Sequence, residues 1–387
     1  MNDTPVSQRT AIAFFGRRNV GKSSLVNAFT GQSVSIVSEV KGTTTDPVTK
    51  TMELLPLGPV QIIDTPGFDD EGQLGQLRVQ RTRSILDQAD IAILVTDATL
   101  PLCPEEQALL ELFQQKQLPW LQVCNKADLL PQIPTEGLYT STLTGYGIET
   151  LKARTAALKP EDRSEPLVAD LLQPGDTAVL VIPIDKAAPK GRLILPQQQT
   201  IRDILEAGAS ALVCRDTELP QTLQSLNTPP KLVITDSQVF GKVDRLVPPQ
   251  LPLTSFSILM ARHKGDLPLM AQGVAAVDTL KTGDRVLIAE GCTHHRQCGD
   301  IGTEKLPNWI CRHTKQEPKF VFCSGKDFPE DLQGFKLVVH CGGCMQTPRQ
   351  MQARLDRCRR QGIPVTNYGV LIAYLNGILE RTLSPFS

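Results

Sequence analysis

The feature of this sequence that most constrains its fold is a glycine-rich run near the amino terminus, Gly16-Arg17-Arg18-Asn19-Val20-Gly21-Lys22-Ser23. The run matches the pattern G-x-x-x-x-G-K-[ST], in which backbone N–H groups converge on phosphate oxygens. Residues 11–15 before it are apolar and predict a buried strand, and residues 24–29 after it predict a helix. A strand, a phosphate-binding turn and a helix in this order predict an α/β domain that binds a nucleotide.

The segment around this run alternates short apolar runs with amphipathic stretches, which predicts a mostly parallel sheet. The predicted strands are 11–15, 60–63, 91–96 and 120–124, and the predicted helices are 24–29, 74–88, 105–116 and 148–158. A run rich in charge and proline at 159–166 predicts a linker. We therefore expect a P-loop nucleotide-binding domain over residues 1–166.

The α/β alternation returns twice after this linker, so the chain is expected to be an α/β protein of three domains. Residues 167–262 predict strands at 178–184, 192–195, 210–214 and 231–235, with a helix at 197–206. Residues 263–387 predict strands at 285–291, 320–323 and 336–339, and helices at 267–280, 348–360 and 370–382. Thr347 and Pro348 are expected to begin the second of these helices as N-cap and first helical residue.

Three further segments predict that the nucleotide carries guanine. Asp64-Thr65-Pro66-Gly67 ends a predicted strand and places Asp64 near Mg²⁺ and Gly67 near the γ-phosphate. Asn125-Lys126-Ala127-Asp128 offers a carboxylate to the N–H donors of guanine, and Ser141-Thr142-Leu143 fits the segment that meets guanine O6. The predicted GTP-binding residues are Gly16, Asn19, Val20, Gly21, Lys22, Ser23, Ser24, Asp64, Gly67, Asn125, Lys126, Asp128, Ser141 and Thr142.

The order and spacing of these segments resemble the GTPase superfamily, and Gly42-Thr43-Thr44-Thr45-Asp46 resembles the first switch of its TrmE–Era group. This resemblance implies that Ser23 and Thr44 ligate Mg²⁺. It also implies a set of residues that act in GTP hydrolysis, namely Lys22, Thr44, Asp64 and Gly67.

The expected rate of hydrolysis follows from departures within these motifs. Thr45 stands where the TrmE–Era group usually carries arginine, and Phe68 stands where Ras-like enzymes carry glutamine. Without an arginine finger or a water-orienting glutamine, intrinsic turnover is expected to be slow. Asn19 occupies the position that holds K⁺ in cation-activated members, so we expect K⁺ to stimulate hydrolysis.

Cysteines gather in the last part of the chain, where seven of the ten follow Glu290. Cys292-Thr293-His294 follows one predicted strand, and His340-Cys341-Gly342-Gly343-Cys344 follows another. If these strands are parallel neighbours, both groups emerge at one edge of the sheet, where α/β proteins bind ligands. Two or three thiolates with imidazole suit zinc, and three thiolates also suit a [4Fe–4S] cluster. The spacing leaves both open. Cys298, Cys311 and Cys323 are weaker candidate ligands, for which packing or surface roles are favoured.

The combination of a TrmE–Era-type GTPase with C-x-H and H-C-x-x-C motifs resembles the HydF family, the GTPases that mature [FeFe]-hydrogenase. The likeness includes residues 191–203 in the middle of the chain. It implies a [4Fe–4S] cluster on Cys292, Cys341 and Cys344, with His294 or His340 as candidates for the fourth ligand. It further implies that residues 167–262 form a dimerisation domain and that residues 263–387 bind the cluster.

The role implied by this resemblance is that of a GTP-hydrolysing scaffold. Such a protein receives a transient dinuclear iron precursor, assembled with the radical-SAM maturases HydE and HydG, and transfers it to apo-[FeFe]-hydrogenase. Homodimerisation through the middle domain is part of the same expectation.

Composition bears on the alternative, a zinc-binding Era/TrmE-like GTPase of RNA modification or ribosome assembly. A net charge of −1 and 5% aromatic residues do not predict a basic, aromatic platform for nucleic acid, so no nucleic-acid partner is expected. No apolar run reaches the length of a membrane span, and the polar first residues lack a signal-peptide core. We therefore expect a cytoplasmic protein with no membrane partner.

Overall fold

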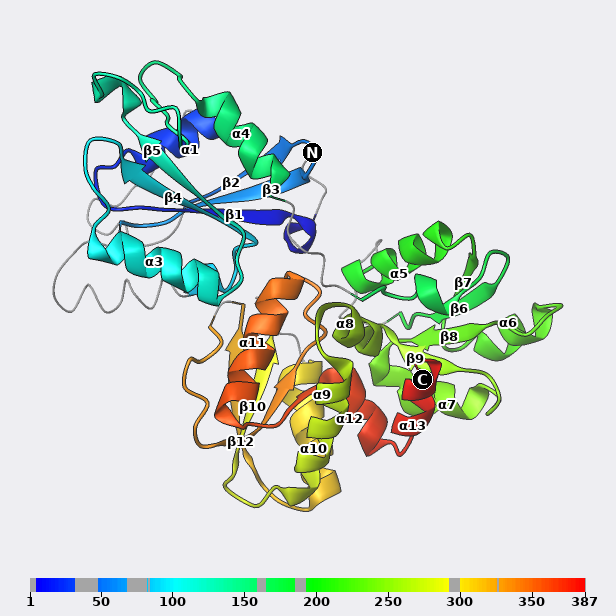
Figure 1. Cartoon of the computed structure of the whole chain (residues 1–387). Helices are drawn as coiled ribbons and strands as arrows, with labels where there is room; N and C mark the ends of the chain where they lie inside the picture. Colours follow the sequence, from blue (N-terminus) through cyan, green and yellow to red (C-terminus); the bar gives the residue numbers. More distant parts are fainter. Residues whose placement is uncertain are drawn as a thin grey trace. The chain divides into compact units, whose positions relative to one another are not determined.

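The computed structural model describes residues 5–31, 48–67, 82, 84–158, 165–184, 193–291, 300–325 and 327–386. The chain divides into two compact units, Met1–Asp162 and Arg163–Ser387. Both are α/β, as the sequence predicts, and each can be followed in Figure 1.

The first unit is built on a sheet of five strands in the order β2-β3-β1-β4-β5. Its strands are β1 (Thr10–Phe15), β2 (Val48–Leu54), β3 (Gly58–Asp64), β4 (Ile91–Asp97) and β5 (Trp120–Asn125). All neighbours are parallel except β2, which pairs with β3 in antiparallel register. Sequence analysis did not predict β2, an edge strand whose residues alternate between exposed and buried.

Helices cover both faces of this sheet: α1 (Lys22–Thr30) and α4 (Ile148–Ala157) on one face, α3 (Pro104–Gln115) on the other (Figure 1). Successive residues of a strand point to opposite faces, and β1 uses this to fill both cores. Phe14 packs against Phe29 of α1, and Phe15 packs against Phe113 of α3, each with ring centroids 5.4 Å apart. Burial on both faces explains why β1 and β4 are almost wholly apolar.

The second unit contains two parallel sheets of four strands each. One has the order β7-β6-β8-β9, with β6 (Thr177–Val181), β7 (Ser210–Cys214), β8 (Leu232–Thr235) and β9 (Leu253–Ser255). The other has the order β11-β10-β12-β13, with β10 (Arg285–Glu290), β11 (Lys319–Ser324), β12 (Phe335–His340) and β13 (Val365–Asn367). In both sheets the first strand lies inside and later strands add on either side, which creates a topological switch point.

The helices of the second unit pack the two sheets into one body. They are α5 (Leu195–Glu206), α6 (Leu219–Ser225), α7 (Phe240–Leu246), α8 (Phe256–Lys264), α9 (Leu267–Gly273), α10 (Leu306–Thr314), α11 (Pro348–Gln361), α12 (Tyr368–Leu375) and α13 (Leu379–Leu383). Helix α8 contacts α5 and β9 on one side and α11, α12 and β13 on the other. One hydrophobic core joins Val179 and Phe240 to Val286 and Leu337. The middle and carboxyl-terminal segments therefore share a core.

Three predicted elements of this unit were wrong in type or extent. Leu195 begins α5 rather than ending a strand, because Pro196 occupies the first turn of that helix. The helix expected at 267–280 ends at Gly273 and continues as a 3₁₀ helix. The helix expected at 370–382 is interrupted after Leu375, where Gly377 has a φ of 72°.

Two further observations concern expectations about the whole chain. Most of the helix expected at 74–88 lies outside the described residues. Among the described residues, no helix is both long and apolar enough to cross a membrane.

Candidate nucleotide and metal-cluster sites

The glycine-rich run forms the turn between β1 and α1, as predicted. A Cβ at Gly16 would lie 2.6 Å from the carbonyl oxygen of Val95, so the turn approaches β4 too closely for any side chain. Asn19 and Gly21 have left-handed φ values of 64° and 82°, which turn the chain into the helix. Lys22 is buried, and its Nζ lies 2.7 Å from Asp64 Oδ1 at the end of β3. The structure thus brings Lys22 of the turn together with Asp64, the residue predicted to lie near Mg²⁺.

The segments predicted to recognise guanine are tied to this turn by hydrogen bonds. Asn125 Nδ2 donates to the carbonyl oxygen of Val20 at 2.9 Å. Thr140 Oγ1 donates to Asn125 Oδ1 at 3.3 Å, and the Ser141 hydroxyl donates to Asp128. Asp128 is exposed, as a carboxylate that meets a base must be. The predicted residues on the loops after β1, β5 and residue 140 therefore form one connected site.

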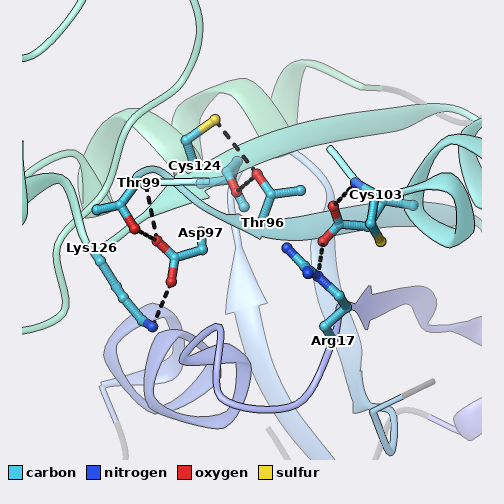
Figure 2. Close-up of polar contacts among 9 residues, drawn as sticks. Arg17, Thr96, Asp97, Thr99, Cys103, Cys124 and Lys126 are labelled. Carbon is cyan, nitrogen blue, oxygen red and sulfur yellow. Dashed lines mark hydrogen bonds and ion pairs between the residues drawn. The ribbon is translucent and has the colours of Figure 1, made fainter. Parts of the chain in front are cut away.

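Asp97 at the end of β4 is a residue of this site that sequence analysis missed. Lys126 has a left-handed φ of 66°, and its Nζ lies 2.6 Å from Asp97 Oδ2 (Figure 2). Burial alone raises the pKa of Asp97, but hydrogen bonds from Lys126 and Thr99 outweigh it and leave that pKa below its usual value. The signal was available, since a carboxylate that ends a buried parallel strand lies at the ligand edge of the sheet.

Glu106 of α3 is a second residue that the sequence did not single out. Its side chain is 0% exposed and accepts hydrogen bonds from Arg17 Nε at 2.9 Å and from the backbone N of Cys103 at 3.0 Å. The bond to Cys103 is half of a capping box, in which the third helical residue reaches back to the N-cap. Glu106 therefore holds the phosphate-binding turn and the start of α3 with one carboxylate.

The two sulfur-bearing motifs follow neighbouring parallel strands, so the condition under which both would emerge at one edge of the sheet is met. Ala289 of β10 pairs with His340 of β12, next to the switch point of the sheet. Beyond the strand ends, the backbone N of Gly291 donates to Cys341 Sγ at 3.0 Å, and that of Gly343 does so at 3.4 Å. Hydrogen bonds of this kind stabilise thiolate ligands of iron–sulfur clusters.

Three predicted site residues, Thr44, Cys292 and His294, lie outside the described residues. Among the described residues no group of three His, Cys, Asp or Glu side chains is arranged to hold a metal ion. The described part of the predicted ligand set therefore consists of Cys341, Cys344 and His340. Cys344 is partly exposed, and burial raises the pKa of its thiol.

His340 has both ring nitrogens engaged. Nδ1 lies 2.8 Å from the carbonyl oxygen of Cys341, and Nε2 lies 2.8 Å from Arg354 Nη1. Because a guanidinium only donates, Nε2 accepts and Nδ1 carries the proton. Burial, and next the charge of Arg354, lower the pKa of His340 to about 3. The lone pair on Nε2 of His340 therefore points at Arg354 and not at a metal ion. This arrangement favours a His340 that orients the Cys341 carbonyl over a His340 that ligates a metal.

The remaining cysteines near these motifs have separate environments. Cys323 is buried in β11, and burial raises the pKa of its thiol to about 11. Cys311 lies in α10, where burial also raises its thiol pKa. Cys298 lies outside the described residues.

Sequence profiles of known domains match most of the chain. Residues 11–126 match a 50S ribosome-binding GTPase, residues 167–265 match the hydrogen maturase F dimerization domain, and residues 268–385 match the hydrogen maturase F tetramerization domain. The last two domains together account for more than half of the chain.

Two curated relatives are similar over part of the chain. The tRNA modification GTPase MnmE of Nitrosospira multiformis is 38% identical over 151 residues, which cover 36% of this chain and 33% of the relative. The GTPase Der of Kosmotoga olearia is 33% identical over 162 residues, which cover 36% of each chain. The chain therefore spans about a third of the length of the curated relatives it matches.

Solved structures are similar over part of the chain as well. A crystal structure of Era from Aquifex aeolicus with GDP and AlF4⁻ is 21% identical, covers 53% of this chain and 92% of its own, and has a TM-score of 0.34. The G domain of the T. maritima FeoB iron transporter is 25% identical, covers 39% of this chain and 98% of its own, and has a TM-score of 0.31. Because two domains particular to hydrogen maturase F follow the GTPase segment in order, this chain belongs to the hydrogen maturase F family.

Proposed function

We propose that the first unit binds GTP with Mg²⁺ and hydrolyses it slowly to GDP and phosphate. The observation that carries this proposal is the connected site of the phosphate turn, Asp64 and the Asn125–Asp128 segment. Lys22, which now reaches Asp64, would turn to the β- and γ-phosphates. Ser23 and Thr44 would ligate Mg²⁺, and Gly67 would donate its N–H to the γ-phosphate.

Base selection in this proposal depends on Asp128. Its carboxylate would accept two N–H donors of guanine, and the Ser141 hydroxyl that donates to it fixes its orientation. Asp128→Asn should shift preference from GTP toward XTP, because an amide offers one acceptor and one donor. Equal affinity of the unmodified protein for ATP and GTP in equilibrium binding would overturn the assignment.

The proposed dependence of GTP turnover on K⁺ rests on Asn19 in the phosphate turn. Asn19 has a left-handed backbone and an exposed side chain beside the phosphate turn. There its amide oxygen could share a K⁺ ion with the nucleotide, supplying the charge of an arginine finger. Turnover should be several-fold faster in K⁺ than in Na⁺, and Asn19→Ala should remove this difference. The same rate in both salts would exclude K⁺ from the mechanism.

We further propose that the second unit carries a [4Fe–4S] cluster held by Cys292, Cys341 and Cys344. The two N–H bonds to Cys341 Sγ and the adjacent ends of β10 and β12 support this assignment. When bound, the cluster would supply an iron with an exchangeable ligand. His340 would orient the Cys341 carbonyl. His294 is a candidate for the fourth ligand, and spectroscopy of a His294→Ala variant would test it.

Anaerobic reconstitution tests the cluster directly. Cys341→Ser and Cys344→Ser should each lose most of the bound iron, while GTP turnover stays close to that of the unmodified protein. Cys311→Ser, a partly exposed cysteine of α10 in the same segment, serves as the matched control and should keep full iron content. Full iron in both site variants, or stoichiometric zinc in the native protein, would overturn the proposal.

The biological role proposed from family membership is that of a carrier in [FeFe]-hydrogenase maturation. The protein would receive a dinuclear iron precursor from a pathway that includes HydE and HydG, and would transfer it to apo-hydrogenase in the cytoplasm. It would act as a homodimer through the middle segment, without a nucleic-acid or membrane partner. A maturation assay with apo-hydrogenase tests this role, and full activation without the protein would refute it.

A further inference from the structure

The turn that carries Cys341 and Cys344 is held by a buried lysine. Lys264, the last residue of α8, is 2% exposed. Its Nζ donates to the carbonyl oxygens of Cys344 at 3.0 Å and Gln346 at 2.9 Å. Burial lowers the pKa of Lys264 to about 8, against the opposing effect of the Cys344 and Cys341 thiolates.

A second buried cation meets the same turn from α11. Arg354 is 8% exposed, donates to His340 Nε2, and stacks on the Phe328 ring with its guanidinium carbon 4.9 Å from the centroid. With the Gln346 amide oriented so that its oxygen faces the guanidinium, that oxygen lies 2.9 Å from Arg354 Nη1. Both ends of the sulfur-bearing turn are thus fixed by positively charged side chains.

No carboxylate among the described residues accepts a hydrogen bond from either cation. Within the part of the chain that the structure describes, all the hydrogen-bond acceptors of Lys264 and Arg354 are backbone carbonyls, an imidazole and an amide. Thiols that could lose a proton lie close to both cations: Cys341 and Cys344 to Lys264, and Cys323, Cys341 and Cys358 to Arg354. A buried charge is unfavourable unless an opposite charge pairs with it. Two buried cations beside one turn therefore favour the binding of an anionic group there.

We propose that Lys264 and Arg354 are the counter-charges of an anionic metal–thiolate centre on the Cys341–Cys344 turn. This inference rests on the proposed cluster and adds two positioning residues, one of which comes from the segment that matches the dimerization domain. The cations hold no metal themselves. They stabilise the negative charge that thiolate ligands of this turn bring to the centre, and they favour the reduced form, which carries one more negative charge.

The experiment measures the midpoint potential of the reconstituted cluster in charge-changing variants. Lys264→Gln keeps N–H donors for the two carbonyls but removes the charge. It should lower the equilibrium constant for one-electron reduction about tenfold, which shifts the midpoint potential by roughly 59 mV to more negative values. Lys264→Arg keeps the charge and should restore most of the shift. Lys281→Gln makes the same charge change at an exposed position of the same unit and should leave the potential unchanged.

A second readout separates charge compensation from simple structural support. Thermal unfolding of the metal-free and cluster-loaded proteins should show that Lys264→Gln destabilises the loaded form more than the metal-free form. A lysine that only satisfies two carbonyls would lower both transitions equally, and that result would overturn the inference. Arg354→Gln, compared with Arg354→Lys, gives the same test at the other cation if Lys264→Gln fails to fold.

The outcomes distinguish this inference from the function on which it rests. A native protein that binds no iron refutes the proposed cluster and the inference together. If the native protein binds the cluster but Lys264→Gln and Lys281→Gln have the same midpoint potential, the counter-charge role is refuted and the proposed cluster stands.

Discussion

Replacing the buried carboxylate of Glu106 should destabilise the first unit measurably. Glu106→Gln keeps the size of the side chain but exchanges one oxygen for an NH₂ group. That group must then face either Arg17 Nε or the backbone N of Cys103, both of which are donors. The substitution therefore leaves one buried donor without its acceptor and removes the charge from the bond that survives.

The size of the effect follows from these two losses. An unsatisfied buried donor costs about 1–3 kcal/mol, and weakening a charge-assisted hydrogen bond to a neutral one costs about 1 kcal/mol more. Arg17 is 22% exposed, so water can replace part of what it loses, and the lower half of this range applies. We expect the free energy of unfolding to fall by about 2 kcal/mol. For a unit of this size that lowers Tm by roughly 4–8 °C.

Calorimetry of the nucleotide-free full-length protein provides the assay, with the transition of the first unit identified by its shift on adding GDP. Glu111→Gln is the matched control, because Glu111 lies on the same helix but is exposed. It should change Tm by less than about 1 °C. A double-mutant cycle with Arg17→Met then isolates the pair. The reasoning fails if Glu106→Gln melts with the control, or if the cycle shows no coupling between Arg17 and Glu106.

Three further outcomes are expected. Val213→Lys on the edge strand β7, where Val213 is 45% exposed, should convert a dimer into a monomer in light scattering, whereas Val48→Lys on edge strand β2 should not. Asp97→Asn should weaken GDP binding about tenfold by releasing Lys126, and an unchanged Kd would refute its role. A hydrogen bond from Tyr374 lowers the pKa of Asp278, so the stabilisation from Asp278 is present above the unfolded value near 3.9 and lost as pH falls through the lower folded value. Tyr374→Phe should raise that pKa in an NMR titration, and an unshifted Asp278 would contradict this.

The nucleotide site could be predicted from sequence because its residues follow buried strands directly. Each motif occupies a strand end, and parallel strands bring their carboxyl ends to one edge without any knowledge of long-range packing. Asp97 and Glu106 escaped prediction for a different reason. Their partners are Lys126 and Arg17, and the pairs join segments that only the folded sheet brings together.

The carboxyl-terminal site was predicted in part. The apolar runs predicted β10 and β12 but left their pairing as a condition, which the structure meets, so Cys341 follows a strand next to β10. The environment of that edge did not follow, because Lys264 and Arg354 lie on separate helices with no pattern that marks them as buried. Short strands were also missed, since three-residue elements such as β9 and β13 are too brief to show a period.

The position of α8 shows why a domain boundary drawn from sequence need not separate two parts that could fold independently. We expected the middle domain to end at residue 262, which falls inside α8 (Phe256–Lys264), and the dimerization-domain match ends just after that helix. Yet Ile258 of α8 lies in the same hydrophobic core as Val286 and Leu337, and the next turn of the helix ends with Lys264 on the sulfur-bearing turn. Removing the middle segment would therefore expose that core and withdraw a buried cation from the proposed cluster site. A contact between subunits at β7 would be continuous with this core through β6, β8, β9 and α8, whereas the GTP site belongs to a separate compact unit. Because of this shared core, we expect changes in the dimerising segment to alter metal binding more than nucleotide binding does.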